Sequence, residues 1–105
     1  MPNKKQIHSL HRGLRILDLI KEDFVFQVQE NFANAAGVAS GLMDNFGFWV
    51  GQPSNHTDFC KLIRSTEEGK KQCLECDWKH TREAFRKGHP IVYRCHAGLV
   101  DFAVR

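Results

Sequence analysis

The spacing of apolar residues changes repeatedly along this chain, and these changes limit the folds that it can adopt. A buried helix face repeats about every 3.6 residues, whereas a strand repeats every two. Apolar residues follow the helical repeat over residues 10–35 and a strand-like repeat over residues 38–50. Over residues 57–104 a helical repeat comes first and a strand-like repeat follows it. The sequence therefore predicts a mixed α+β fold with the element order α-α-β-β-α-α-β-β.

Two consecutive helices are predicted in the first third of the chain. An apolar stripe from Leu10 to Ile20 makes residues 1–22 an N-terminal amphipathic helix, and a second stripe follows directly. Asp23 can cap the second helix, and Gly37 can end it in the left-handed conformation. The first stripe fits two arrangements equally well, namely docking on its own domain or pairing with a helix of a partner chain.

Two more helices are predicted after residue 56. Thr57 or Asp58 can cap a short helix. Ser65 and Glu68 have the spacing of a capping box, in which each side chain accepts from a free amide of the other residue's backbone. The longer helix that begins there should end at Gly88, since a proline follows two residues later.

Four strands are predicted in two hairpins. Residues 38–43 and 46–50 flank an Asp-Asn turn, and residues 91–95 and 99–104 flank a His-Ala-Gly loop. The expected fold is thus an antiparallel sheet of about four strands with flanking helices and an N-terminal amphipathic helix.

Length and charge exclude several classes of protein. A chain of 105 residues has room for one modest core. The net charge is +3, but residues 23–60 contain no Lys or Arg, which argues against general nucleic-acid binding. No apolar run approaches the length of a membrane span, and the N-terminus lacks a signal-peptide pattern, so we expect a cytoplasmic protein without membrane contact.

Four cysteines are the main chemical signal. In a reducing compartment, cysteines are metal ligands, redox thiols or buried small residues more often than disulfides. Cys73 and Cys76 stand three apart on one predicted helix face, and Cys60 and Cys95 can join them to bind Zn²⁺ or an iron centre. We expect the four to converge, although a redox pair and plain buried thiols remain open alternatives.

The histidines and aromatic residues allow both functional and ordinary explanations. His56 and His96 fall in loops beside the elements that carry Cys60 and Cys95, so either can replace a thiol or bind a ligand. Neighbouring side chains on a strand point to opposite faces, so Cys95 and His96 do not form a catalytic pair and we expect no enzyme activity. The aromatic residues of the later elements either line a cavity or simply form the core: Phe48, Trp49, Phe59, Trp78, Phe85, Tyr93 and Phe102.

Three motifs, in this order, resemble the PocR sensory domain. They are Asn-His-Thr-Asp-Phe-Cys at residues 55–60, Cys-Leu-Glu-Cys-Asp at 73–77, and Tyr-Arg-Cys-His-Ala-Gly-Leu at 93–99 with Asp-Phe-Ala at 101–103. The similarity extends from about residue 17 to residue 104. The resemblance implies a variant of the Per-Arnt-Sim (PAS) fold that binds small molecules such as diols, usually beside a DNA-binding, histidine-kinase or diguanylate-cyclase module.

The resemblance also gives a division of the chain and a ligand site. Residues 23–105 would form the sensory domain, without the final strand and helix usual in the family, and its output module would be separate. A small apolar or hydroxylated ligand would contact five residues: Trp49, Phe59, Trp78, Tyr93 and His96. The early end of the last strand and the stripe of the first helix favour a homodimer. The alternative function is a metal or redox sensor in which the cysteine cluster itself is the input.

Overall fold

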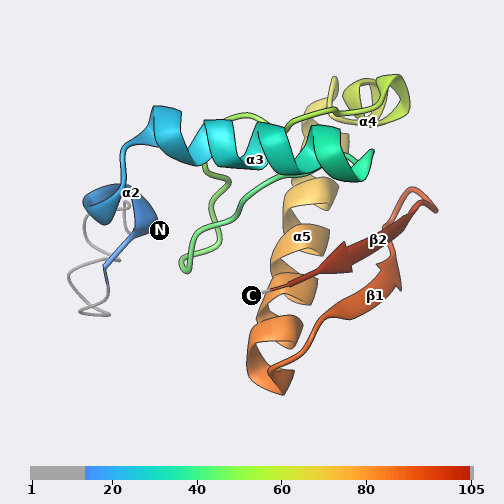
Figure 1. Ribbon diagram of the computed structural model, residues 1–105. Coiled ribbons are helices and arrows are strands. Elements are labelled where there is room, and N and C mark those ends of the chain that lie inside the picture. The colour runs from blue at the N-terminus through green and yellow to red at the C-terminus, as the bar shows by residue number, and fades with distance from the viewer. Residues whose placement is uncertain (1–13, 105) are drawn as a thin grey trace. The chain divides into compact units, whose positions relative to one another are not determined.

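The computed structural model describes residues 14–104, which belong to two compact units, Met1–His56 and Thr57–Arg105 (Figure 1). Each unit is considered by itself. Within the described residues, the chain forms four helices and one antiparallel sheet of two strands, which confirms the α+β class. None of the described helices combines the length and the apolar character needed to cross a bilayer.

The first unit is built around one helix. After the short α2 (Ile16–Leu19), α3 spans Glu22–Ala36 and ends at Gly37, which has the predicted left-handed conformation with φ +67°. The N-cap is Lys21, not Asp23, which instead lies in the first turn with Glu22 and adds favourable charge near the helix N-terminus. The predicted start of the N-terminal helix at Leu10 lies outside the described residues.

Residues 38–56 do not form the regular hairpin that the sequence predicts. Only two isolated bridges occur here, Ser40 with Ser54 and Met43 with Trp49. The carboxylate of Asp44 accepts hydrogen bonds from the backbone N–H groups of Phe46 and Phe48, at 2.9 and 3.0 Å. Beside the second bridge, the Asp44 N–H donates to the Phe48 carbonyl and the Val50 N–H donates to the Leu42 carbonyl, both at 2.8 Å. The alternating pattern therefore yields short pairing around a turn that the Asp44 side chain holds, and not two regular strands.

Buried polar contacts hold this loop region to α3 and to the start of α2. The amide Nε2 of Gln29 donates to the Gln52 carbonyl at 2.7 Å and lies 3.0 Å from the Ser54 hydroxyl. The side chain of Asp44 is 1% exposed and pairs with Arg15 at 3.2 Å. These buried groups are satisfied by specific partners, which sets the path of the loop.

The second unit contains two helices and the sheet. Thr57 caps α4 (Asp58–Ile63) by accepting from the Cys60 N–H, as predicted. The 21-residue α5 (Glu67–Lys87) is capped by Thr66, one residue later than predicted, and it ends at the left-handed Gly88. Thr66 accepts from the Gly69 N–H at 3.0 Å, so the cap is made by a single side chain instead of the predicted capping box.

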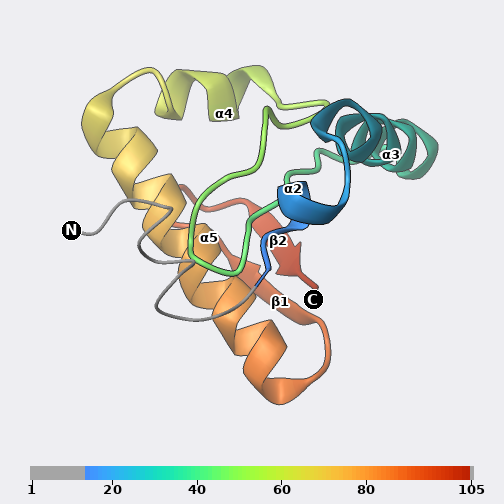
Figure 2. The ribbon, with the colours of Figure 1, turned by 90° about the vertical axis from the view of Figure 1, so that its left-hand side faces the viewer.

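The sheet is a hairpin of β1 (Ile91–Arg94) and β2 (Val100–Ala103) that packs on α5 (Figure 2). Tyr93 pairs with Asp101 on the face toward α5, whereas Val92 and Phe102 pair on the exposed face. The described residues thus contain two strands where the sequence predicts four. The four-stranded PAS-like sheet is not confirmed and stays a prediction.

Candidate functional site

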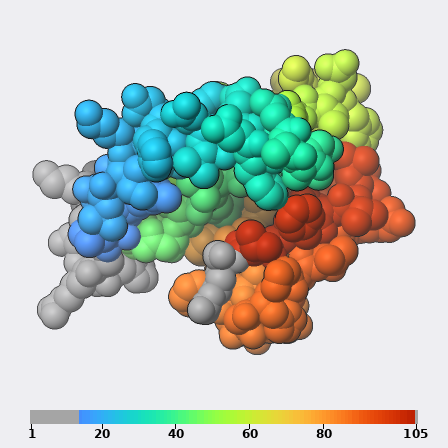
Figure 3. Space-filling view, viewed as in Figure 1, coloured from blue at the N-terminus to red at the C-terminus, as the bar shows by residue number. Residues whose placement is uncertain are grey.

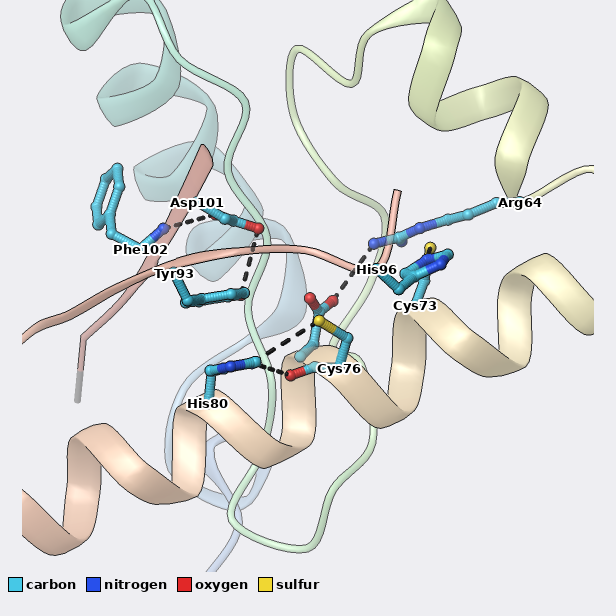
Figure 4. Close-up of polar contacts among 9 residues, drawn as sticks. Arg64, Cys73, Cys76, His80, Tyr93, His96, Asp101 and Phe102 are labelled. Atoms are coloured by element: carbon cyan, nitrogen blue, oxygen red, sulfur yellow. Dashed lines mark hydrogen bonds and ion pairs between the residues drawn. The ribbon is translucent and has the colours of Figure 1, made fainter. Parts of the chain in front are cut away.

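A polar seam lies between α5 and the hairpin in the second unit (Figure 4). Cys73, Cys76, Asp77 and His80 are three or four residues apart on α5 and therefore share one helix face. Across from them the hairpin supplies Tyr93, His96 and Asp101, and the end of α4 supplies Arg64. Together these eight side chains are called the seam below.

Cys73 lies beside a histidine and an arginine from two other elements. Its Sγ is 3.1 Å from Nε2 of His96, in the turn between the strands. Burial raises the pKa of the Cys73 thiol above its usual value, and a hydrogen bond from Arg64 opposes part of that shift. The thiol is therefore mainly neutral at pH 7, with a cation close enough to favour the thiolate.

Cys76 has a similar environment one turn further along α5. Its Sγ is 3.7 Å from Nδ1 of His80, and the same nitrogen is 2.8 Å from the Cys76 carbonyl. Burial raises the pKa of the Cys76 thiol, while the backbone N–H of His96 lowers it as a hydrogen-bond donor. His96 thus interacts with both cysteines, through its ring and through its backbone.

His80, Tyr93 and Asp101 form the next part of the seam. The rings of His80 and Tyr93 stack with centroids 3.6 Å apart and planes inclined by 2°. The Tyr93 hydroxyl donates to the Asp101 carboxylate at 3.3 Å, and burial strongly raises the pKa of the phenol. Tyr93 therefore remains a protonated donor at any physiological pH.

Arg64 joins the two helices at the other end of the seam. It follows α4 as its C-cap and its guanidinium is 3.4 Å from the Asp77 carboxylate. Both side chains are largely shielded, with 22% and 28% of their surface exposed. The pair adds no net charge to the seam, yet it leaves a guanidinium beside Cys73.

The four cysteines gather in the second unit but do not form the predicted metal centre. All four are free and half-buried. The charges of Cys60 and Cys95 raise the pKa of Cys73 and of Cys76 respectively, so each lies within electrostatic range of one member of the pair. In residues 14–104, however, no group of three or more His, Cys, Asp or Glu side chains is placed to hold a metal ion. The four-thiolate site is therefore not supported.

The five predicted ligand contacts are distributed over both units. Tyr93 and His96 lie in the seam. Phe59 is on α4 and 44% exposed, and Trp78 lies on another face of α5, where Arg82 sits 5.2 Å from its ring centroid. Trp49 belongs to the first unit, as does His56. Of the five, Tyr93 and His96 are members of the seam, and the contact of all five with a ligand stays a prediction.

Sequence reasoning missed four members of the seam. They are Arg64, Asp77, His80 and Asp101, none of which was given a role in a site. The spacing of four between Cys76 and His80 places them on one helix face and is a signal that the sequence does contain. Arg64 carries no such signal, because its proximity to Asp77 depends on the turn between α4 and α5.

Comparisons with known proteins agree on one family. The family model described as the sensory domain found in PocR matches residues 18–105. The regulatory protein PocR of Salmonella typhimurium is 31% identical over 85 residues, which cover 81% of this chain. The match covers 28% of the length of that protein. No solved structure matches the chain.

Proposed function

The chain belongs to the family of the sensory domain found in PocR, and on that premise we propose that it binds a small hydroxylated molecule as the input of a regulatory system. The family match across residues 18–105 is the observation that carries this proposal. The domain would act without catalysis, because sensing requires only that a ligand favour one conformation over another.

The seam supports this proposal through its hydrogen-bonding groups. The half-buried Tyr93 stays protonated and donates its one proton to Asp101, so its oxygen can accept from a ligand hydroxyl, and His96 can donate or accept according to its tautomer. A hydroxyl group needs both a donor and an acceptor, and Asp101 supplies a further acceptor beside Tyr93. A hydroxylated ligand would find complementary groups along this surface of the second unit.

The output belongs to the proposal as well. We propose a cytoplasmic protein that passes its ligand state to a DNA-binding, kinase or cyclase module, and that associates as a homodimer. The relative is a regulatory protein of which this chain matches only part. An apolar strand face in the second unit supports self-association.

Ligand binding can be tested by thermal unfolding with a panel of short aliphatic alcohols and diols. A ligand at about 100 times its dissociation constant adds roughly 2.7 kcal/mol to the stability of a single-site protein, so the midpoint should rise with concentration. His96→Ala should reduce the shift, whereas His89→Ala, which changes an exposed histidine outside the seam, should not. If no compound stabilises the protein in either the presence or the absence of added Zn²⁺, the proposal is wrong.

A second candidate function takes the thiols themselves as the input, through a metal or through oxidation. The separation of 3.1 Å between Cys73 Sγ and His96 Nε2 favours it, because thiol–imidazole pairs are common in metal and redox sites. Metal analysis and thiol counting on protein purified without oxygen would test it. Metal-free protein whose thiols do not respond to mild oxidation would contradict it.

A further inference from the structure

We infer that Cys73 reversibly captures a small aldehyde as a hemithioacetal, with His96 moving the proton and Arg64 holding the new oxygen. Such a capture goes beyond the proposed function, because it adds a covalent step and a different class of ligand, a carbonyl compound. All three side chains belong to the second unit, and they come from α5, the turn of the hairpin and the end of α4. The adduct would therefore affect three elements through one sulfur atom.

The thiol of Cys73 is in hydrogen-bond contact with an imidazole. Its Sγ is 3.1 Å from Nε2 of His96, and Figure 4 shows the ring beside the sulfur. A nucleophile and a base within hydrogen-bond reach are the arrangement that activates a thiol for attack on a carbonyl carbon. When Nε2 is the unprotonated nitrogen of the ring, it can accept the thiol proton as the sulfur attacks.

The guanidinium of Arg64 supplies the positive charge that stabilises the product of this attack. It donates a hydrogen bond to the Cys73 thiol and lies 3.4 Å from the Asp77 carboxylate. An arginine that reaches the sulfur can also reach the carbonyl oxygen, which is bonded to the carbon that the sulfur attacks. A donor fixed beside a developing alkoxide stabilises it without further rearrangement.

Cys76 also has a neighbouring histidine, but that histidine is not a base for it. Nδ1 of His80 is 2.8 Å from the Cys76 carbonyl, and a carbonyl oxygen only accepts, so this nitrogen carries its proton. The same nitrogen lies 3.7 Å from the Cys76 sulfur, and it cannot take a second proton from the thiol. Cys73 is therefore the nucleophile, and Cys76 on the same helix is its matched control.

The Cys73 thiol is accessible and mainly protonated, and both properties suit an aldehyde. His96 is exposed and Cys73 is half-buried, so a small solute can reach the sulfur from solvent. Burial raises the pKa of the thiol, which disfavours a free thiolate at pH 7. Addition to an aldehyde needs no lasting thiolate, because the thiol proton ends on the oxygen of the product.

The step balances without any further reactant. Sγ of Cys73 forms a bond to the carbonyl carbon, and the π electrons of the C=O bond move onto the oxygen beside Arg64. The thiol proton passes to Nε2 of His96 and from there to that oxygen, which becomes the hydroxyl of the hemithioacetal. Nothing is oxidised or reduced and no group leaves, so the same steps in reverse release the aldehyde.

NMR of the reduced, metal-free chain with acetaldehyde labelled with ¹³C at its carbonyl tests the nucleophile. The unaltered chain should give one adduct resonance, separate from those of the free aldehyde and its hydrate. Cys73→Ser should lose this resonance, whereas Cys76→Ser and Cys60→Ser should keep it. Borohydride converts any lysine imine into a stable amine that mass spectrometry locates, and circular dichroism shows whether each variant is folded.

Affinity and exchange rate separate the roles of the two partners. The adduct should form at least about tenfold more tightly than that of N-acetylcysteine, a factor that one hydrogen bond from a charged donor can supply. Arg64→Gln should remove most of this gain, whereas Arg86→Gln, which changes an exposed arginine at the end of α5, should not. His96→Ala should slow the exchange of free and bound aldehyde by about 100-fold, and His89→Ala should leave it unchanged.

Four results would overturn the capture of an aldehyde by Cys73. They are no adduct in the unaltered chain, an adduct that persists in Cys73→Ser, label on lysines in place of a thiol, or an unchanged exchange rate in His96→Ala. The thermal shift with diols judges the proposed function separately. A chain that diols stabilise and acetaldehyde does not modify keeps the proposed function and loses the covalent site, and the opposite pair of results keeps only the covalent site.

Discussion

Cys73 is the residue at which three elements meet. Its thiol contacts His96 of the hairpin turn and Arg64 at the end of α4, while its backbone belongs to α5. Any chemistry at this sulfur would therefore act on the hairpin and on α4 together. The sequence identifies Cys73 through its spacing to Cys76, but it gives no indication of the arginine, because that contact is set by the turn between two helices.

The raised pKa of the Cys73 thiol gives a pH-dependent prediction. The folded chain holds this proton more tightly than the unfolded chain, whose cysteines ionise near the usual pKa of 9.0. The contribution to the free energy of unfolding is thus complete below pH 9.0 and falls as pH rises from 9.0 through the higher folded-state pKa. Iodoacetamide reacts with the thiolate, so its rate of reaction with Cys73 rises with pH. We expect this rate to reach half its maximum at a higher pH in native protein than in urea.

Alkylation of Cys73 is followed over time by mass spectrometry of its peptides, from pH 7 to 11 under reducing, metal-free conditions. The rates give the midpoint pH of the native chain and that of the unfolded chain. Cys73→Ser should also weaken the fall in stability above pH 9, as judged by urea unfolding. Equal midpoints in native and unfolded chains would show that burial does not affect this thiol as the structure indicates.

Among the elements, helices were predicted more accurately than strands. The apolar repeat located α3 and α5, and Gly37 and Gly88 correctly marked their ends, because left-handed glycine is a local requirement of the chain. Residues 38–50 pair only at isolated bridges, and the Asp44 side chain bonds two backbone amides at the turn between them. Alternation of apolar residues does not show how far such pairing extends, whereas a tight turn with its glycine, as at Gly98, is visible in the sequence.

The connection between α4 and α5 gives a prediction about one glycine. A Cβ at Gly69 would lie 1.9 Å from the carbonyl oxygen of Ile63, far closer than any non-bonded contact allows. Alanine normally stabilises a helix by about 1 kcal/mol relative to glycine, but here overpacking against backbone should outweigh that gain. We expect Gly69→Ala to lower the free energy of unfolding by about 1–3 kcal/mol.

Urea unfolding followed by circular dichroism measures this change. Gly41→Ala is the matched control, because the nearest atom to its added Cβ is the Pro53 Cβ at 4.0 Å, an ordinary contact. A Gly69→Ala protein as stable as the unaltered chain would mean that the two helices approach each other less closely in solution.

At the scale of the whole molecule, large apolar side chains remain on the surface. In the hairpin, Val92 and Val100 are 73% and 68% exposed, and Phe102 and Val104 are about half exposed. The space-filling view shows part of this hairpin, in red, at the surface (Figure 3). A monomer seldom leaves so many neighbouring apolar residues in water, so this face of the hairpin favours association.

We therefore expect homodimers that bury the exposed face of the hairpin. Light scattering at micromolar concentration should give about twice the chain mass of 12.1 kDa. Val100→Lys should shift the chain toward monomer, because association would bury an unpaired charge. Leu62→Lys is the matched control, since Leu62 lies on α4 and is also 68% exposed. A monomeric unaltered chain, or dimers lost equally in both variants, would show that the hairpin face is not the contact.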